Sequence, residues 1–438
     1  MNHAFDIVVV GAGPAGLAAA TAAARAGKRV ALLDENLQAG GQIWRTGVGK
    51  AHANRARARA IAAFQNSGAQ MFPGRQVVDA TSASELKAWV DFNQALETFA
   101  FGSLIIATGA RERFLPFPGW TLPGVFGAGG LQALVRSGYD VRGKRVVVAG
   151  TGPLLLAVAA HLKQDGAEIV SINEQAPMRK LVKFGAGLLF HPEKVFQGFR
   201  LRAVLSGVPY RTNCWPLKAE GSDAITGVRL TNGMKTWTEK CNLLACGFHL
   251  VPNIEIAALL GCSIVEGLVQ VDKDQRTSIE CIYCAGEPTG VAGVEAATLQ
   301  GEIAGHAAAR SSYAAPLYRR RNSQVDFGRA MSRAFALREE LLNLAQPDTI
   351  ICRCEDLRLD QLQAHAVPNV SWTDAKLQTR CGMGPCQGRV CGPALEAIFG
   401  WRNTSVRPPL FPVPVAAMCS APEPKAQSSM PISMETSQ

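Results

Sequence analysis

Residues 5–16 read FDIVVVGAGPAG, and this stretch decides the fold. Its apolar, β-branched part predicts a buried strand at 5–10, and the alanine-rich residues 17–26 predict a helix directly after the glycine turn. Gly11, Gly13 and Gly16 form the pattern G-x-G-x-x-G. The first glycine permits the tight turn, the second lets the backbone approach a pyrophosphate, and the third allows close helix packing. The sequence therefore predicts a dinucleotide site.

Residues on both sides of this turn complete the predicted site. Pro14 and Ala15 lie within the turn, where a helix begins with free N–H groups and the positive end of its dipole toward the phosphates. A second strand is expected at 29–33, followed by Asp34 and Glu35. A carboxylate at the end of that strand can accept hydrogen bonds from an adenosine ribose.

The strand, turn and helix pattern returns at residues 144–173 (KRVVVAG, then TGPLLLAVAAHLKQDGA, then EIVSIN). Gly150 and Gly152 repeat the first two glycines, but Leu155 replaces the third, and either Asn173 or Glu174 could meet a ribose. NAD, ATP or ADP could bind such a weakened motif, and NADP is least expected because no arginine immediately follows the strand. The duplication predicts an α/β protein with two Rossmann-type dinucleotide-binding domains.

Five of the twelve cysteines fall within forty residues near the C-terminus. Cys352 and Cys354 form C-x-C, Cys386 follows after 31 residues, and Cys391 after four more. Four thiolates can hold zinc or an iron–sulfur cluster, and the arrangement favours the cluster because structural zinc sites more often use C-x₂₋₄-C pairs. Cys381 is a surplus thiol that could replace Cys391 as the fourth ligand.

Composition narrows the range of functions. The chain has 438 residues, 47% of them hydrophobic, and a formal charge of +10, but its basic residues are scattered and no nucleic-acid motif is present. The sequence shows no secretion leader and no membrane-length apolar run, so a cytoplasmic location is expected. Residues 41–60 and 115–150 contain no cysteine, which argues against disulfide exchange, and Cys281 and Cys284 are expected in the core.

Three further segments resemble the glutathione reductase and thioredoxin reductase superfamily. They are GGQ at Gly40–Gln42, ATG at Ala107–Gly109 and YCAGE at Tyr283–Glu287. The resemblance implies FAD at the first site and places the following residues around it: Gly41 and Gln42 near the flavin, Ala107, Thr108 and Gly109 on the pyrophosphate side, and Gly286 and Glu287 at the ribityl chain.

ICRCEDL and TRCGMGPCQGRVC resemble the [2Fe-2S] domain that is similar to bacterioferritin-associated ferredoxin, in the form found behind flavoprotein dehydrogenases. The order of all these parts, with PGWTLPGVFGAGGLQALV at Pro118–Val135, resembles the larger FAD-binding subunit of heteromeric amine dehydrogenases. That family includes octopine and nopaline oxidases, D-hydroxyproline dehydrogenase, dye-linked L-proline dehydrogenase and hydrogen cyanide synthase.

This resemblance implies that a D-amino-acid-oxidase-like partner subunit oxidises the amine. A quinone-type acceptor and a small ferredoxin-like [2Fe-2S] subunit would complete the complex, through which any membrane association would arise. The chain itself would relay electrons and hold no catalytic residue, with structural roles for His161, His191 and His249. An NADH-dependent reductase of the ferredoxin-reductase type is the alternative, and a scaffold with vestigial sites is the non-enzymatic one.

The expected domains follow from these assignments. Residues 1–115 and 248–312 form the FAD-binding domain, 116–247 the second nucleotide-binding domain, 313–347 a helical linker, 348–403 the [2Fe-2S] domain and 404–438 an extended or disordered tail. Helices are expected at 51–66 and 327–345, the latter ended by Pro347.

Overall fold

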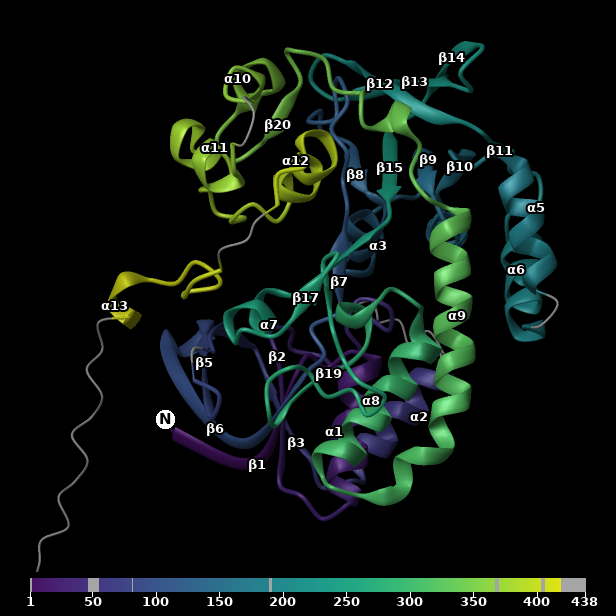
Figure 1. Cartoon of the computed structure of the whole chain (residues 1–438). Helices are drawn as coiled ribbons and strands as arrows, with labels where there is room; N and C mark the ends of the chain where they lie inside the picture. Colours follow the sequence, from purple (N-terminus) through teal and green to yellow (C-terminus); the bar gives the residue numbers. More distant parts are fainter. Residues whose placement is uncertain are drawn as a thin grey trace, which may run out of the picture.

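The computed structural model contains two sheets of parallel core strands, each flanked by helices, and a small domain rich in cysteine (Figure 1). It describes residues 2–45, 55–80, 82–188, 191–366, 370–402 and 406–418. The predicted α/β architecture with two Rossmann-type folds is confirmed. Residues 46–54 and 419–438, which include the start of the predicted helix at 51–66 and most of the predicted tail, lie outside the described residues.

The first fold is built around β1 (Asn2–Val10), whose apolar end is buried on both faces because helices cover both sides of a parallel sheet. Its sheet has the order β3-β2-β1-β6-β5-β4, and β19 pairs with β6. The other strands are β2 (Val30–Asp34), β3 (Gln70–Pro73), β4 (Arg75–Asp79), β5 (Glu85–Val90), β6 (Ala95–Ile106) and β19 (Ile282–Cys284).

Helices α1 (Pro14–Arg25) and α8 (Val294–Ala308) pack closely beside this sheet. A Cβ atom on Gly301 would lie 2.0 Å from the carbonyl oxygen of Ala15, and one on Gly305 would lie 2.3 Å from that of Ala19. The two glycines are therefore required for this contact between residues far apart in the sequence. Helix α2 (Arg55–Gln65) packs on α1 and buries only Phe64.

The second fold has a parallel sheet in the order β11-β10-β9-β15-β8. Its strands are β8 (Val125–Gly127), β9 (Arg145–Thr151), β10 (Glu168–Glu174), β11 (Tyr210–Thr212) and β15 (Leu243–Phe248), and its helices are α3 (Ala128–Arg136), α4 (Leu154–Gln164), α5 (Met178–Gly187) and α6 (Pro192–Val204). An antiparallel sheet of β12 (Trp215–Gly221), β13 (Ile225–Thr231) and β14 (Thr236–Lys240) extends from it.

Shorter elements connect the two folds. Strands β7 (Ala110–Glu112) and β16 (Leu250–Pro252) pair antiparallel, so the chain leaves the first fold and returns to it side by side. The remaining elements around the first fold are α7 (Glu255–Leu259), β17 (Ile264–Val265), β18 (Leu268–Val269) and the 3₁₀ turns η1 (Asp91–Asn93) and η3 (Glu287–Thr289).

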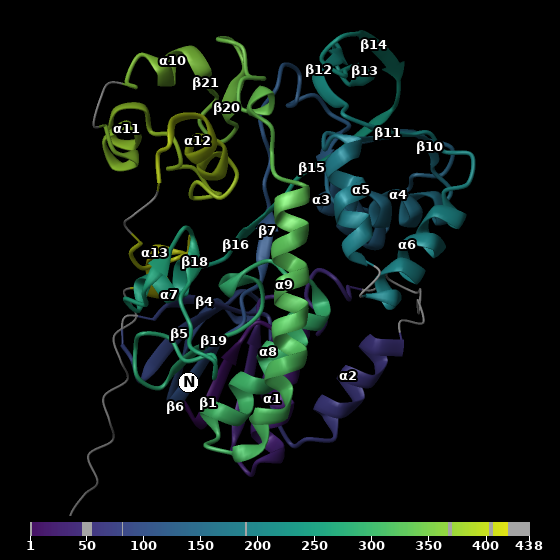
Figure 2. The same cartoon turned by 45° about the vertical axis from the view of Figure 1, so that its right-hand side comes forward.

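A long helix leads from the first fold to the cysteine domain, past the second fold (Figure 2). After η4 (Ser312–Leu317), α9 runs from Tyr318 to Ala334, so the expected helix at 327–345 was misplaced. Pro347 does not stop it. The helix ends because the carbonyl of Phe335 instead accepts hydrogen bonds from side chains of the second fold.

The cysteine domain has its own small core around Leu362, Trp372 and Leu395. After η5 (Glu339–Leu341), it comprises β20 (Ile350–Cys352), β21 (Leu357–Arg358), α10 (Leu359–Gln363), α11 (Trp372–Thr379) and α12 (Cys391–Phe399). Residues 406–418 then return along the first fold and end in α13 (Val415–Met418) (Figure 1). Leu410 is buried there, and its backbone amide donates to the carbonyl of Val78 at 2.8 Å.

Among the described helices, none has the length and apolar character needed to cross a bilayer.

Candidate functional site

The glycine turn of the first fold lies where the ends of β1 and β6 meet. Gly11 has φ +104°, and a Cβ atom there would lie 2.3 Å from the carbonyl oxygen of Ala107. A Cβ atom on Gly16 would lie 1.7 Å from the carbonyl oxygen of Gly11. Strand order reverses at this point of the sheet, with β2 on one side of β1 and β6 on the other. Ligands of open α/β sheets bind in this crevice.

The N-terminus of α1 is open to an anion. Pro14 occupies the first turn, Gly13 caps the helix without a side-chain hydrogen bond, and the turn contains no acidic residue. A Cβ atom on Gly13 would meet nothing within 4 Å, so free space adjoins the backbone where a pyrophosphate would approach. The turn therefore fits a dinucleotide.

Asp34 and Glu35 take different places at the end of β2. The Asp34 carboxylate accepts hydrogen bonds from the backbone amides of Ala12 at 2.6 Å and Asn36 at 2.7 Å. Glu35 is exposed and accepts from Gln76 at 3.2 Å, on the side of β4. Asp34, rather than Glu35, is thus the carboxylate beside the glycine turn.

The segments expected to contact the flavin converge on the same turn. The Gly40 amide donates to the Ala12 carbonyl at 2.8 Å, and a Cβ atom on Gly41 would lie 3.0 Å from the Cα of Gly13. Gln42, next to Gly41, is exposed. A Cβ atom on Gly286 would lie 3.0 Å from that of Ala15.

Glu287 and the Ala107–Gly109 segment form the other wall. A Glu287 carboxylate oxygen lies 3.9 Å from where Gly109 would carry a Cβ atom, and burial raises the pKa of the Glu287 carboxyl to about 7. The Thr108 hydroxyl donates to the Asn253 carbonyl at 2.6 Å, which fixes this wall to the strand pair β7–β16. Taken together, the first fold has the surfaces that FAD needs.

The second fold repeats the arrangement with an acid one carbon longer. The amide of Gly152 donates to the Glu174 carboxylate at 2.7 Å, so Glu174 is the counterpart of Asp34. Asn173 is fully buried and bonds Ser171 at 2.8 Å. Leu155 fits because α4 begins at Leu154, one motif position later than α1, and its side chain packs against Gly247.

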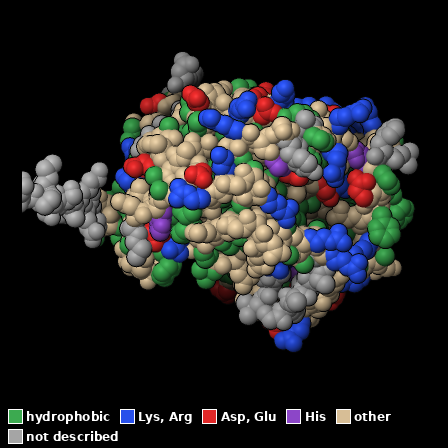
Figure 3. Space-filling view, turned by 90° about the horizontal axis from the view of Figure 1, so that it is seen from below, with side chains coloured by type: hydrophobic (Ala, Val, Ile, Leu, Met, Phe, Trp, Pro, Cys, Tyr) green, Lys and Arg blue, Asp and Glu red, His purple; other side chains and the backbone are tan. Residues whose placement is uncertain are grey.

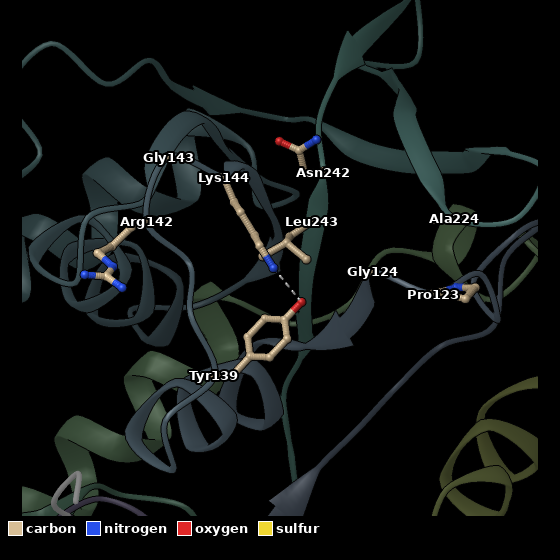
Figure 4. Close-up of a pocket in the computed structure, with 9 residues that line it drawn as sticks. All are labelled: Pro123, Gly124, Tyr139, Arg142, Gly143, Lys144, Ala224, Asn242 and Leu243. Atoms are coloured by element: carbon tan, nitrogen blue, oxygen red, sulfur yellow. Dashed lines mark hydrogen bonds between the residues drawn. The ribbon is translucent and has the colours of Figure 1, made fainter.

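A groove on the second fold, shown in Figure 4, is not part of this arrangement. Its lining includes Lys144, Leu243 and Gly124, which lie at the amino ends of β9, β15 and β8. The Lys144 ammonium donates to the Tyr139 hydroxyl at 3.1 Å across it. The groove therefore opens at the edge of the sheet opposite the glycine turn, where no dinucleotide is expected.

The five clustered cysteines come together in the third domain. Cys352, Cys381 and Cys391 have sulfur atoms within 4.8 Å of one another and are buried. Cys386 hydrogen-bonds both Cys391 and Cys354, and Cys354 is exposed. A Cβ atom on Gly384 would lie 2.2 Å from that of Cys354, so the glycine-rich loop is needed for this approach.

The thiols of this cluster share protons with one another. Hydrogen bonds with Cys381 and Cys391 lower the pKa of the Cys352 thiol to about 2, and one with Cys391 lowers the pKa of Cys386 to about 5. The same contacts raise the pKa of Cys391. The donor set fits a four-thiolate iron–sulfur or zinc site. It brings the four predicted ligands and Cys381 together, and leaves open which thiol is the fifth.

The cysteine loop reaches the first fold through Arg389. Its guanidinium donates to the Leu410 carbonyl at 2.9 Å and lies 3.9 Å from the Phe411 ring centroid, beside the ion pair of Arg111 and Glu255 (2.8 Å). Arg111 also donates to Asn253, which bonds Thr108 of the flavin wall. No local sequence signal marked this connection, because its members come from four distant segments.

Residues 5–308 match the family model described as pyridine nucleotide-disulphide oxidoreductase. The chain belongs to this family. FAD is the cofactor that membership implies at the first fold, in agreement with the geometry above.

Two relatives within the pyridine nucleotide-disulphide oxidoreductase family match along nearly their whole length. The hydrogen cyanide synthase subunit HcnB of Pseudomonas protegens is 30% identical, with 94% of this chain and 96% of the relative covered. A subunit of opine oxidase from Agrobacterium tumefaciens is also 30% identical, with 96% and 93% covered. The recognition of this subunit group from the sequence is confirmed.

The fold also resembles L-proline dehydrogenase from P. horikoshii, with a TM-score of 0.67 and 18% identity over 95% of this chain and 80% of that one. The chain is thus a flavin-dependent oxidoreductase subunit of this family, and its relatives are subunits of larger enzyme complexes.

Proposed function

We propose that the chain is the electron-transfer subunit of a heteromeric amine dehydrogenase acting on a D-amino acid, an imino acid or an opine. It receives electrons from a D-amino-acid-oxidase-like partner subunit, and it delivers them to a quinone-type acceptor. The observation that carries the proposal is the presence, in one chain, of a flavin cradle at Gly13 and a thiol cluster at Cys352, joined through Arg389.

Each site has a defined task in this proposal. FAD exchanges one or two electrons and a [2Fe-2S] cluster exchanges one, so the pair would supply the conversion between a two-electron donor and one-electron carriers. The N-terminus of α1 and Asp34 would hold the pyrophosphate and ribose of FAD. Cys352, Cys354 and Cys386, with Cys391 or Cys381, would hold the cluster.

The chain is proposed to leave amine oxidation to its partner. Among the histidines, His249 donates its Nε2 proton to the Phe335 carbonyl at 2.7 Å, and burial lowers its pKa. His191 packs on Phe327 at 4.9 Å between ring centroids. These contacts are structural, as expected of a subunit that relays electrons.

A surface suited to a partner lies on α5 and α6. None of their side chains is buried, and Met178, Val182, Phe196 and Phe199 are 57–73% exposed beside several lysines and arginines. Figure 3 shows hydrophobic side chains next to basic ones at its right-hand edge, the side on which α5 and α6 lie in Figure 1. Exposed apolar groups of this kind mark subunit interfaces. We assign this surface to the oxidase-like subunit in a cytoplasmic complex, which a small ferredoxin-like [2Fe-2S] subunit would complete.

The test is to purify the chain by itself and together with its partner. The isolated chain should carry flavin and iron but show no amine dehydrogenase activity, which should require both subunits. Full activity of the isolated chain would contradict the relay role. Anaerobic NADH tests the alternative, a ferredoxin-reductase-like enzyme: rapid flavin bleaching would favour it, and the proposal expects none.

A further inference from the structure

The segment Phe335–Arg338, which we call the strap, crosses the carboxyl edge of the second sheet directly after α9. The Phe335 carbonyl accepts hydrogen bonds from Thr151 at 3.1 Å, Gln175 at 3.3 Å and His249 at 2.7 Å. Thr151 ends β9, Gln175 follows β10, and His249 follows β15. A single backbone oxygen is therefore bound by the ends of three neighbouring strands, at the point where the strand order reverses.

The strap is fixed on both sides of this contact. The amide of Gln175 also donates to the Ala336 carbonyl at 3.2 Å. The Arg338 guanidinium donates to the Gln175 carbonyl at 2.8 Å and to Asn213 at 2.6 Å, and lies 4.0 Å from the Trp215 ring centroid. Phe335 itself is 6% exposed.

The ribose-binding position of the second fold is closed under the strap. Glu174 is fully buried, with one carboxylate oxygen bonded by Thr151 and the Ala176 amide, each at 2.9 Å, and the other by Gly152. The Thr151 hydroxyl lies within hydrogen-bonding distance of both Glu174 and Phe335. A ribose hydroxyl could reach this carboxylate only after the strap had moved.

The strap leads directly into the cysteine domain. Leu341 and Leu344, a few residues later, are buried in the hydrophobic cluster of the second fold. The Trp120 indole of that cluster donates to the Ile350 carbonyl at 2.6 Å, two residues before Cys352. A docked strap thus holds the cysteine domain against the second fold.

We propose that the crevice of the second fold is a peptide-binding site filled by the chain's own strap, so that an adenine nucleotide and the strap exclude one another there. The fold then serves to position the cysteine domain, and nucleotide binding requires release of the strap. This inference does not depend on the amine, the partner or the electron acceptor.

The experiment titrates the full chain with ADP and, separately, with NADH by calorimetry, and follows tryptic cleavage after Arg338 by mass spectrometry. For the native chain we expect no binding below about 1 mM of either nucleotide, and slow cleavage. The double variant Gln175→Ala/His249→Ala loses the side chains that bond the strap carbonyls. It should be cut at least about ten-fold faster and should bind ADP, since each lost hydrogen bond is worth up to about ten-fold.

The matched control is Gln94→Ala/His365→Ala, which removes the same residue types away from the strap and should behave as the native chain does. If the variant fails to fold, the native chain still decides: nucleotide binding that speeds cleavage after Arg338 supports exclusion. Tight binding with unchanged cleavage overturns it, as does a variant with a loosened strap that still binds no ADP. Flavin and iron contents are unaffected in every arm, which separates this test from the test of the proposed function.

Discussion

The backbone amide of Gly152 donates a 2.7 Å hydrogen bond to the Glu174 carboxylate, as the amide of Ala12 does to Asp34 at 2.6 Å. The two folds thus retain the same acid-to-loop contact, but the strap encloses only the second one. Because Glu174 is enclosed, its ionised form is poorly solvated, and desolvation raises the pKa of its carboxyl from 4.5 to about 7.

This shift predicts a pH-dependent stability. The folded chain binds the proton of Glu174 more tightly than the unfolded chain, so the stabilisation is complete below about pH 4.5 and is lost as the pH rises through about 7. Denaturant unfolding at pH 5 and pH 8 should show the native chain losing up to about 3 kcal/mol relative to Glu174→Gln. Glu168→Gln, an exposed substitution on the same strand, should leave the native pH dependence unchanged. A constant difference between the native chain and Glu174→Gln would contradict the assignment.

Asp34 should be required for flavin affinity. Replacing it with alanine removes the carboxylate that would accept the ribose hydroxyls, and a hydrogen bond to a charged group contributes about 1.5–3 kcal/mol. We expect Asp34→Ala to weaken FAD binding about 10- to 100-fold, measured as flavin absorbance per chain during dialysis. Excess FAD should restore the spectrum, and Asp79→Ala on the same fold should retain its flavin. Unchanged retention by Asp34→Ala would exclude Asp34 from the ribose site.

Patterns confined to one segment were readable from the sequence, whereas contacts between distant segments were not. The glycine spacing around Gly13 and the cysteine spacing around Cys352 predicted which residues would gather. The end of α9 was missed because Phe335 is held by residues more than eighty positions away. For the same reason Leu410 was expected in a tail, although it packs on the first fold beside Val78.

The exposed face of α5 and α6 should be needed for assembly. Phe196 and Phe199 are each 73% exposed, so Phe196→Ser/Phe199→Ser should leave the melting temperature of the isolated chain nearly unchanged. We expect the double variant to lose co-purification with the oxidase-like subunit. Met234→Ser is the matched control, because Met234 is 87% exposed on the separate antiparallel sheet. Normal assembly of the phenylalanine variant would place the interface elsewhere.

Serine substitutions should identify the cluster ligands. Cys352→Ser, Cys354→Ser and Cys386→Ser should each reduce bound iron and sulfide to less than about half of the native content, because a serine hydroxyl is a poor substitute for a thiolate with iron. Cys241→Ser, at a buried cysteine of the second fold, should retain the full content. The pair Cys381→Ser and Cys391→Ser then decides the fourth ligand. The sulfur atoms of these two residues are 3.9 Å apart, so either could serve. The C-x₄-C spacing predicts that Cys391→Ser loses the cluster, whereas Cys381→Ser keeps it with a shifted electron paramagnetic resonance signal, since a neighbouring hydrogen-bond donor to the ligand sulfurs has changed. The opposite result would make Cys381 the ligand, and retention of iron by all five variants would mean that these thiols hold no cluster.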